Sequence, residues 1–291
     1  MISTLDALVR RLDELCAEQP FETGWCLKDP RRGETAHRRG AVVVPSASTR
    51  KISILMAALR AVHAGRLSLG QTVTIQAKYQ ISHSGCFQHF RPGFAVTLHD
   101  VLTMMIIVSD NTCTGTVVDM LGLDELNGFC RSVGMTGTTH RQGIPPNTDP
   151  RGVRYLEGPS DVSGMNATTP HDVALLLELI LQGVRDPAAA ARLGCTPELC
   201  RVAVEILSWQ KLNSRLPALL PTGTKVAHKT GTGPGVINDA GIVFAGTPPL
   251  FILAAYTQQV PWALADGTPG KAAAERHIAR LCRTCWDALN V

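Results

Sequence analysis

The chain has 291 residues, of which 45% are hydrophobic and 18% charged, and its formal net charge is a modest +4. This composition is typical of a folded globular protein and excludes an intrinsically disordered chain. The length allows one large domain or two interleaved domains around a sizeable core. The densest basic group, Arg31, Arg32, Arg38 and Arg39, is more typical of a solvated hairpin than of a nucleic-acid surface, so we expect no nucleic-acid partner.

The N-terminal segment predicts an amphipathic helix. Leu5, Leu8, Leu12 and Leu15 follow helical spacing, and charged residues fill the opposite face. A secretory signal needs an uninterrupted apolar core, which this segment lacks. No run of 18 or more apolar residues occurs in the chain, so we expect no membrane span. The expected location is cytoplasmic, or periplasmic or secreted if a leader has been removed.

The rest of the chain predicts strands at both ends and helices in the middle. Strand patterns cover 21–27 and 36–44, joined by a turn-rich segment, and recur over 226–230, 239–244 and 250–256. Helical patterns cover 48–65, 98–108, 124–133, 170–182 and 272–289. This order predicts an α/β fold of the α+β type, in which an antiparallel five-stranded sheet from both chain ends carries N- and C-terminal helices and an inserted helical domain. We assign 1–46 and 196–291 to the sheet domain and 47–195 to the helical domain, including a loop-rich stretch over 134–165.

Nine cysteines are spread along the chain without the spacing of a disulfide framework. Most have apolar neighbours, where cysteine packs as a small hydrophobic residue. Cys282 and Cys285 have the spacing of half a zinc site, but no second pair follows. We therefore expect no metal and no other cofactor, and the cysteine usage favours a reducing compartment.

Ser48 and Lys51 form the first of three chemically suggestive motifs, S-x-x-K. Ser48 follows a strand and a proline and opens a helix, where free N–H groups favour negative charge. Lys51 lies on the same helical face and can take the hydroxyl proton if burial and nearby cations lower its pKa. An ordinary N-cap serine and a surface lysine would give the same spacing, which is expected about once by chance in a chain of this length.

Ser109, Asp110 and Asn111 form the second motif, S-D-N, and they follow a strongly apolar helical run. Three polar residues at the end of a buried helix either cap that helix or face a cleft. Ser109 can relay a proton to a leaving nitrogen, and Asn111 can hold a substrate amide. Asp110 fits an internal structural anchor better than a catalyst.

Lys229, Thr230 and Gly231 form the third motif, K-T-G, on a predicted strand. Lys229 together with Thr230 and Thr232 can bind a carboxylate. Gly231 lies on the same face as Lys229, and its missing side chain is expected to let a substrate backbone approach. The neighbouring His228 points the other way and is interpreted as structural. A strand end with a solvated lysine remains the simpler alternative.

Together, the three motifs in this order resemble those of class A β-lactamases and penicillin-binding proteins. The resemblance extends to four further segments and covers about residues 20–290. These segments are Gln88 to Thr112, Asn166 to Pro170, Val226 to Gly231, and Asn238 to Ile242. It implies an active site between the two domains, with Ser48 as nucleophile, Lys51 as base and Ser109 as proton shuttle. It also implies that Asn111 binds substrate, that Lys229, Thr230 and Thr232 bind its carboxylate, and that the backbone N–H groups of Ser48 and Thr232 form the oxyanion hole.

One part of the family pattern is missing. Class A enzymes resemble one another in a Glu-x-x-x-Asn of the Ω loop, whose glutamate activates the deacylating water. Residues 126–148 contain no Asp or Glu, and Gln142 to Pro146 occupies the expected place. Glu157, Asp161 or His140 could replace the glutamate, or nothing does.

These observations leave three hypotheses. The first is a serine hydrolase that forms an acyl-enzyme at Ser48 and hydrolyses a β-lactam or related amide, with slow deacylation. The second is a peptidase, esterase or acyltransferase with the same nucleophile. The third is a penicillin-binding sensor that acylates without turnover. All three predict a small-molecule substrate with a carboxylate, and the sequence carries no signal for an oligomeric state.

Overall fold

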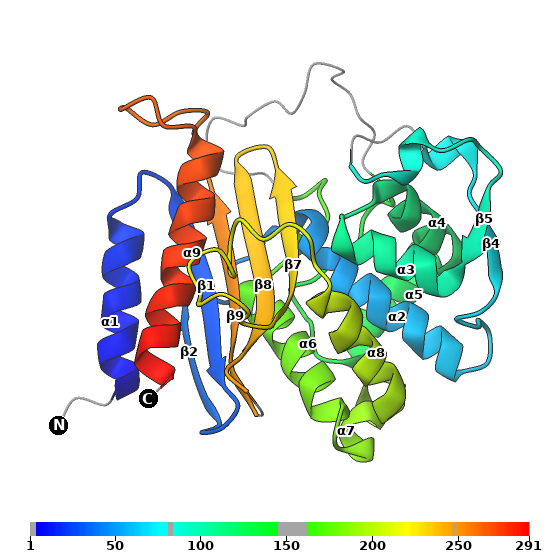
Figure 1. Cartoon of the computed structure of the whole chain (residues 1–291), viewed down its shortest axis with the longest axis horizontal. Coiled ribbons are helices and arrows are strands. Elements are labelled where there is room, and N and C mark those ends of the chain that lie inside the picture. The colour runs from blue at the N-terminus through cyan, green and yellow to red at the C-terminus, as the bar shows by residue number, and fades with distance from the viewer. Residues whose placement is uncertain (1–3, 81–83, 145–161, 247, 291) are drawn as a thin grey trace.

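The computed structural model describes residues 4–80, 84–144, 162–246 and 248–290. Its main sheet has five antiparallel strands in the order β2-β1-β9-β8-β7, so that strands from both chain ends lie side by side (Figure 1). These strands are β1 (Glu22–Asp29), β2 (Glu34–Arg38), β7 (Val226–Gly233), β8 (Val236–Phe244) and β9 (Pro249–Gln258). Short pairs are formed by β3 (Val44–Pro45) with β6 (Ala167–Thr168) and by β4 (Thr72–Thr74) with β5 (Ala95–Thr97).

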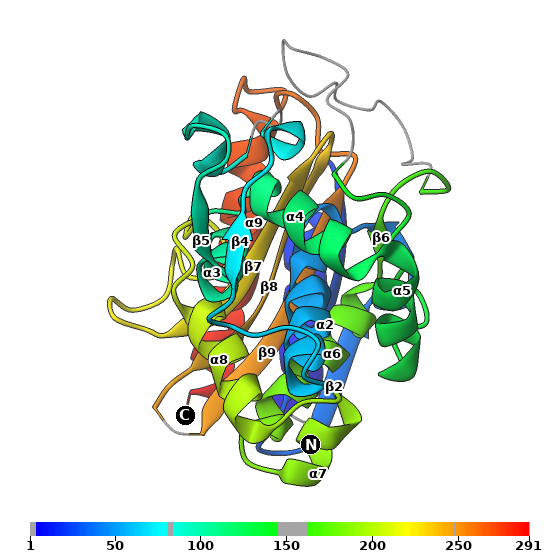
Figure 2. The same ribbon diagram turned by 90° about the vertical axis from the view of Figure 1, so that its right-hand side faces the viewer.

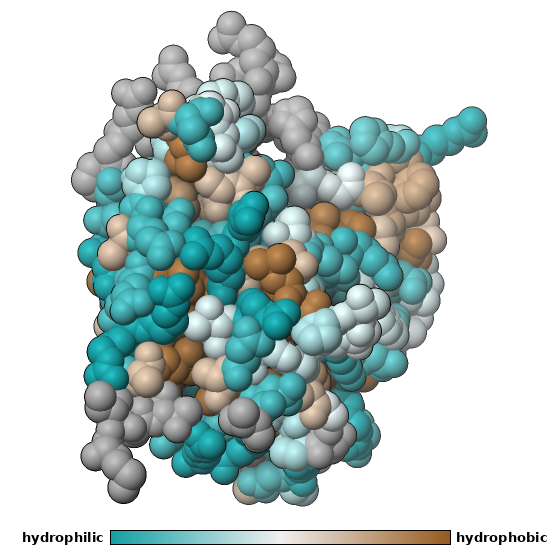
Figure 3. Space-filling view, turned by 60° about the vertical axis from the view of Figure 1, so that its left-hand side comes forward, coloured by the Kyte–Doolittle hydropathy of each residue, from teal (hydrophilic) through white to brown (hydrophobic). Residues whose placement is uncertain are grey.

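Helices cover both faces of the sheet. Those at the chain ends, α1 (Thr4–Ala17) and α9 (Gly270–Leu289), pack on one face, and their outward surface is mostly hydrophilic (Figures 1 and 3). The others form a group on the opposite face. They are α2 (Lys51–His63), α3 (Leu98–Ile107), α4 (Asn111–Leu121), α5 (Leu123–Ser132), α6 (Pro170–Gly183), α7 (Pro187–Arg192) and α8 (Pro197–Ser208).

The two layers have separate hydrophobic cores. Leu12, Trp25, Phe251 and Ile278 belong to the core under α1 and α9, whereas Ile252 belongs to the core shared with the helical group. Because β9 is buried on both faces, its sequence is a nearly continuous apolar run. This arrangement confirms the predicted fold class.

Helix α2 runs through the middle of the helical group, with α8 on one side and α5 on the other (Figure 2). Residues 51–59 are all buried, which is typical of a core helix that is apolar nearly all round. The buried helix is therefore a rigid support for its own first residues, which follow Ser48 in the chain. Within the part of the chain that the structure describes, no helix is long and apolar enough to cross a membrane.

The structure differs from the predicted elements in one strand and three helices. The strand predicted over 36–44 is interrupted, because Arg39 adopts a positive φ of 51° and the chain turns before the separate strand β3. Helices α4, α7 and α8 were not predicted; in α4, threonines and a glycine obscure the helical pattern. The division into 1–46 with 196–291 and 47–195 stays a prediction, because α8 packs both against α2, α3 and α6 and against the sheet strand β7.

The cysteines are all free thiols in this structure, and eight of the nine are buried. Burial raises the pKa of the Cys26 thiol to about 12, which makes it a poor nucleophile. Cys86 is the exposed one.

Candidate active site

Ser48 lies in a short 3-10 turn, η1 (Ala47–Arg50), which leads directly into α2. Ser48 is half-buried. The preceding residue, Ala47, has a φ of 44°, a conformation that costs free energy for a residue with a side chain. The surrounding structure therefore holds the turn in a strained geometry next to the predicted nucleophile.

Three neighbouring elements hold the nucleophile turn in place. Ser46 donates its backbone N–H to the Asn166 carbonyl at 2.9 Å, and Asn238 of β8 donates its side-chain amide to the carbonyl of Pro45 at 3.1 Å. Thr49 accepts a 2.9 Å bond from the Tyr256 hydroxyl of β9. These bonds tie the turn to the sheet on one side and to the 165–166 segment on the other.

Gly231 of β7 packs directly against this turn. A Cβ atom at this position would lie 3.1 Å from the Ser46 carbonyl oxygen and 3.2 Å from the Ala47 Cβ. The prediction that the missing side chain of Gly231 makes room for a substrate backbone is therefore wrong, because a Cβ atom here would point at the nucleophile turn. The missing side chain makes room for the protein's own nucleophile turn instead.

Lys51 is almost fully buried and makes three polar contacts with the second motif. Its Nζ lies 2.7 Å from the Ser109 carbonyl oxygen, 3.1 Å from Ser109 Oγ and 2.7 Å from Asn111 Oδ1. Burial, followed by the charges of Lys229 and Arg50, lowers the pKa of Lys51 well below its usual value. A lysine in this setting can exist as the neutral amine that a general base requires.

The second motif lies between α3 and α4 in a strained loop. Ser109 has a positive φ of 58°, and Asp110 caps α4 by accepting the backbone N–H of Cys113 at 3.0 Å. The same carboxylate accepts the backbone N–H groups of Cys86 and Phe87 at 2.7 and 2.8 Å. These three bonds fit the predicted role of Asp110 as an internal anchor.

Lys229 lies in the middle of β7 and is fully buried. Its Nζ donates a 2.9 Å bond to the carbonyl of Thr230, itself a buried residue. Burial lowers the pKa of Lys229 to about 7, and Asp239 opposes this shift. His228 faces the other side of the strand and contacts the Asp239 carboxylate at 2.9 Å, as its structural interpretation predicts.

Arg215 is a residue of the site that the sequence motifs did not reveal. The guanidinium donates to the carbonyls of Gly231 and Asn238 at 2.7 and 2.6 Å, and to Thr232 Oγ1 at 2.5 Å. It also forms an ion pair with Glu275 of α9 at 3.3 Å. The only available signal was an arginine in a loop fourteen positions before Lys229, which carries no recognisable pattern.

A pocket of about 450 Å³ joins these elements. It is lined by Ser48, Arg50, Lys51, Asn111, Thr232 and apolar residues that include Ile144 and Met165. The described residues that line it include no carboxylate. Ser109 contacts the pocket residue Lys51, and Lys229 and Thr230 are buried in the adjacent strand. The structure thus brings Ser48, Lys51, Asn111 and Thr232 to one cavity, whereas Ser109, Lys229 and Thr230 do not line it.

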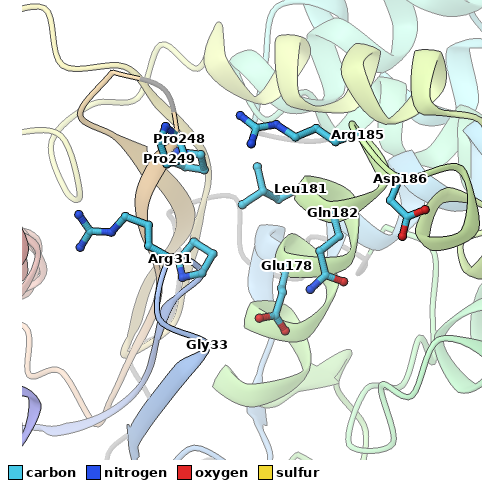
Figure 4. A pocket seen from close by; sticks show the side chains of 10 residues that line it. Arg31, Gly33, Glu178, Leu181, Gln182, Arg185, Asp186, Pro248 and Pro249 are labelled. Carbon is cyan, nitrogen blue, oxygen red and sulfur yellow. The ribbon is translucent and has the colours of Figure 1, made fainter.

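A second groove, of about 620 Å³, lies at the opposite end of the sheet (Figure 4). It is formed by the β1–β2 turn, the start of β9 and the outer face of α6. Leu181 and Pro249 give it an apolar floor, and Glu178 at its edge is paired with Lys28 at 2.7 Å. None of the three motifs contributes to it.

The wall of the pocket opposite β7 is the segment in which a deacylating glutamate was expected. Asn166 Oδ1 accepts the backbone N–H groups of Arg141 and Gln142 at 2.9 and 3.2 Å. His140 is buried, and its ring nitrogens lie 3.3 Å from Arg50 Nη1 and 3.0 Å from Ser53 Oγ. Burial lowers the pKa of His140 to about 3, so it is a weak base at neutral pH. Glu157 and Asp161 lie outside the described residues.

This fold, with a buried lysine linking the serine turn to a second polar loop, is of the β-lactamase-like class. Residues 7–289 match the Beta-lactamase enzyme family, and the chain belongs to it. Beta-lactamase AER-1 of Aeromonas hydrophila is 29% identical over 72% of this chain, and the match spans 64% of the AER-1 length. Beta-lactamase regulatory protein BlaB of Streptomyces cacaoi is 24% identical over 96% of this chain and 97% of its own.

Solved structures agree with this assignment. A β-lactamase from Sphaerobacter thermophilus is 26% identical, with a TM-score of 0.80 and 97% of each chain covered. PBP-A is 26% identical, with a TM-score of 0.81 over 98% of this chain and 97% of its own. A mutant of PBP-A, 27% identical with a TM-score of 0.81 and the same coverage, was solved as an acyl-enzyme complex with penicillin G.

Proposed function

We propose that the protein opens a β-lactam or related amide through a covalent acyl-enzyme at Ser48, and that water clears this intermediate slowly. In the first step the Ser48 oxygen bonds to the substrate carbonyl carbon, and Lys51 accepts the hydroxyl proton. The carbon–nitrogen bond then breaks, and Ser109 passes a proton to the leaving nitrogen. The ester formed at Ser48 is later hydrolysed.

The contacts of Lys51 carry this proposal. A neutral amine has two N–H donors and one lone pair, so it can donate to the Ser109 carbonyl oxygen and to Asn111 Oδ1 while its lone pair remains available for the Ser48 proton, with Ser109 Oγ within reach at 3.1 Å. After it takes a proton from Ser48, it can donate to all three oxygens. The same three partners therefore suit both protonation states, and Ser109 is in place to receive the proton and pass it on.

The β7 side of the pocket supports binding of a substrate carboxylate. Thr232 is exposed in the pocket, and Arg215 holds its hydroxyl from behind. Lys229 and Thr230 add a buried positive charge and a second hydroxyl in the adjacent positions of the strand. The backbone N–H groups of Ser48 and Thr232 are proposed to stabilise the oxyanion that forms during acylation.

Slow deacylation is proposed because the described pocket lining supplies no base for water. A hydrolytic water needs a group that accepts its proton. His140 does not fit this role, because Arg50 and Ser53 contact both of its ring nitrogens. The acyl-enzyme is therefore expected to persist long enough to be observed.

Intact-mass measurements over minutes to hours with penicillin G test the proposal. The wild-type protein is expected to gain the mass of one intact penicillin, because ring opening loses no atoms, and then to return to its original mass over hours. Ser48→Ala is expected to form no adduct. Ser68→Ala, which alters an exposed serine beyond the far end of α2, is the matched control. Neither adduct nor turnover on the wild-type protein would contradict the use of a β-lactam.

A second candidate function is a sensor that is acylated without turnover. The similarity to a regulatory protein over nearly the whole of both chains favours it, as does the carboxylate-free lining of the described pocket. In the same experiment, a penicillin adduct that persists unchanged would favour the sensor. If Ser48 reacts with other acyl reagents but not with penicillin, the peptidase, esterase or acyltransferase hypothesis gains support.

A further inference from the structure

Arg50 is a buried cation inside the nucleophile turn, between the serine and the lysine of the first motif. Its side chain is almost completely enclosed, at 6% exposure for the whole residue. No ion pair joins it to a carboxylate among the described residues. Burying a charge without a counter-charge is costly, so its neighbours must compensate through hydrogen bonds.

The guanidinium obtains this compensation from the pocket wall opposite β7. Nη1 donates to the Gln142 carbonyl at 2.8 Å, Nη2 donates to the Gly143 carbonyl, and Nη1 lies 3.3 Å from His140 Nδ1. Since Gln142 lines the same pocket as Ser48, the arginine joins the nucleophile turn to the wall that faces an acyl group. A planar fork that binds two adjacent carbonyls fixes their orientation as well as their distance.

The surrounding hydrogen bonds form a closed circuit. His140 Nδ1 is an acceptor for Arg50, which places the ring proton on Nε2, and Nε2 then donates to Ser53 Oγ at 3.0 Å. The Ser53 hydroxyl donates in turn to the Arg50 carbonyl at 2.7 Å. His140 is therefore the neutral acceptor that supports the arginine.

Arg50 also differs from the other charged groups around Lys51. Lys229 from β7 and Arg50 disfavour the protonated form of Lys51, whereas Asp110 and Cys113 from the second motif favour it. The pKa of Lys229 is lowered to about 7, so its charge is lost as the pH rises above neutrality. Burial lowers the pKa of Arg50 only to about 10, so its charge persists from acid to mildly alkaline pH.

We propose that Arg50 is a positioning residue for acylation, whose guanidinium fixes the Gln142–Gly143 wall and whose permanent charge acts on the adjacent Lys51. This inference rests on the proposed function. It assigns two separable effects to one side chain. The hydrogen-bonding fork orders the wall against which a substrate binds, and the charge keeps Lys51 ready to accept a proton.

Two variants separate these effects. Arg50→Met keeps an unbranched side chain but removes both the charge and the fork. Arg50→Lys also loses the fork, and it keeps a positive charge only below the pKa of the new ammonium, which burial lowers as it does for Lys51 and Lys229. Arg60→Met is the matched control, because Arg60 lies near the far end of α2, the helix that follows Arg50, and contacts Ser132, away from the pocket. If Arg50→Met fails to fold, Arg50→Gln serves as the neutral variant.

The charge effect is read from the pH dependence of Ser48 labelling by a fluorophosphonate, a reagent that reports serine activation without needing a β-lactam. The rate rises with pH as Lys51 loses its proton. Removing a nearby positive charge raises the Lys51 pKa, so the midpoint for Arg50→Met is expected to move up by about one pH unit. The control is expected to keep the wild-type midpoint, and the midpoint of Arg50→Lys is expected to lie between those of the wild type and Arg50→Met.

The wall effect is read from the penicillin G concentration that gives half-maximal acylation. Both Arg50 variants are expected to raise it by about tenfold, since both lose the bidentate contact. A loss of stability alone would change neither the pH midpoint of labelling nor the ratio of the half-saturating penicillin G concentrations of Arg50→Met and Arg50→Lys.

Each outcome has a distinct meaning. An unchanged pH midpoint in Arg50→Met would overturn the charge effect, and an unchanged half-saturating concentration in Arg50→Lys would overturn the wall effect. A wild-type protein whose Ser48 resists the fluorophosphonate would contradict the proposed function and this inference with it. If Ser48 is labelled but penicillin forms no adduct, only the β-lactam substrate is contradicted, and the pH midpoint still decides the role of Arg50.

Discussion

The two walls of the pocket differ in the kinds of residues and contacts that form them. On the side formed by β7 and the S-D-N loop, each buried cation is held by named contacts: Lys51 by the S-D-N loop, and Arg215 by Glu275 and two backbone carbonyls. On the opposite side, asparagine amides and the Arg50 fork hold backbone groups, and the described lining offers no carboxylate. In the proposed mechanism, residues of the first wall form the ester at Ser48, and residues of the second wall determine the shape of the cavity. Acylation and hydrolysis are therefore separate requirements, and a chain can keep one without the other.

Replacing Lys51 should damage the first wall most. We expect Lys51→Met to lower the rate of penicillin acylation by about 10³-fold, because the Ser48 proton loses its acceptor. The measurement is the rate of adduct formation by intact mass, and Lys211→Met, at an exposed lysine, is the control. Acylation within a few-fold of wild type would show that another group is the base.

Arg215 should matter less, because it supports the carboxylate site without carrying the chemistry. We expect Arg215→Met to raise the half-saturating penicillin concentration by about ten- to a hundredfold, since Thr232 and two carbonyls of the sheet lose a charged donor. The maximal acylation rate should change much less. Arg276→Met, at a neighbouring exposed arginine of α9, is the control. An equal loss in both parameters would indicate a general collapse of the β7 edge instead.

The second wall should respond to an added base. Gln142→Glu has nearly the same shape and lines the pocket, and the charge of Arg50 would keep its carboxylate ionised. We expect it to shorten the lifetime of the penicillin adduct by about tenfold, with little effect on adduct formation. Gln142→Met, which has similar length but no carboxylate, is the control. If both variants shorten the lifetime equally, the effect comes from altered packing and the proposed difference between the walls is lost.

The sequence predicted the first wall well because its residues belong to short, local patterns. Ser48 and Lys51 lie one helical turn apart, and the S-D-N loop follows an apolar helix, so each fragment could be placed before the fold was known. The alternation of apolar residues likewise predicted the central strands and most of the helices. The broken strand after Arg38 was missed because a single residue with positive φ leaves no trace in the apolar pattern.

The second wall was not predictable in the same way. Arg50 occupied an unspecified position of the first motif, and only the tertiary structure shows that it is buried and bound to residues about ninety positions away. On the first wall, Arg215 was missed as well, because it reaches β7 from a loop without a pattern. The interpretation of Gly231 was wrong in direction because the sequence does not reveal which neighbour a missing side chain accommodates.

The exposure of a single thiol gives a practical means of observing this site. Cys86 donates its backbone N–H to Asp110, the residue that anchors the S-D-N loop, and the other eight cysteines are buried. A maleimide dye should therefore label the native protein at this one position without any engineering of the chain. Because Cys86 is bonded to the residue that anchors the S-D-N loop, the fluorescence of the dye is expected to report on changes in that loop in real time.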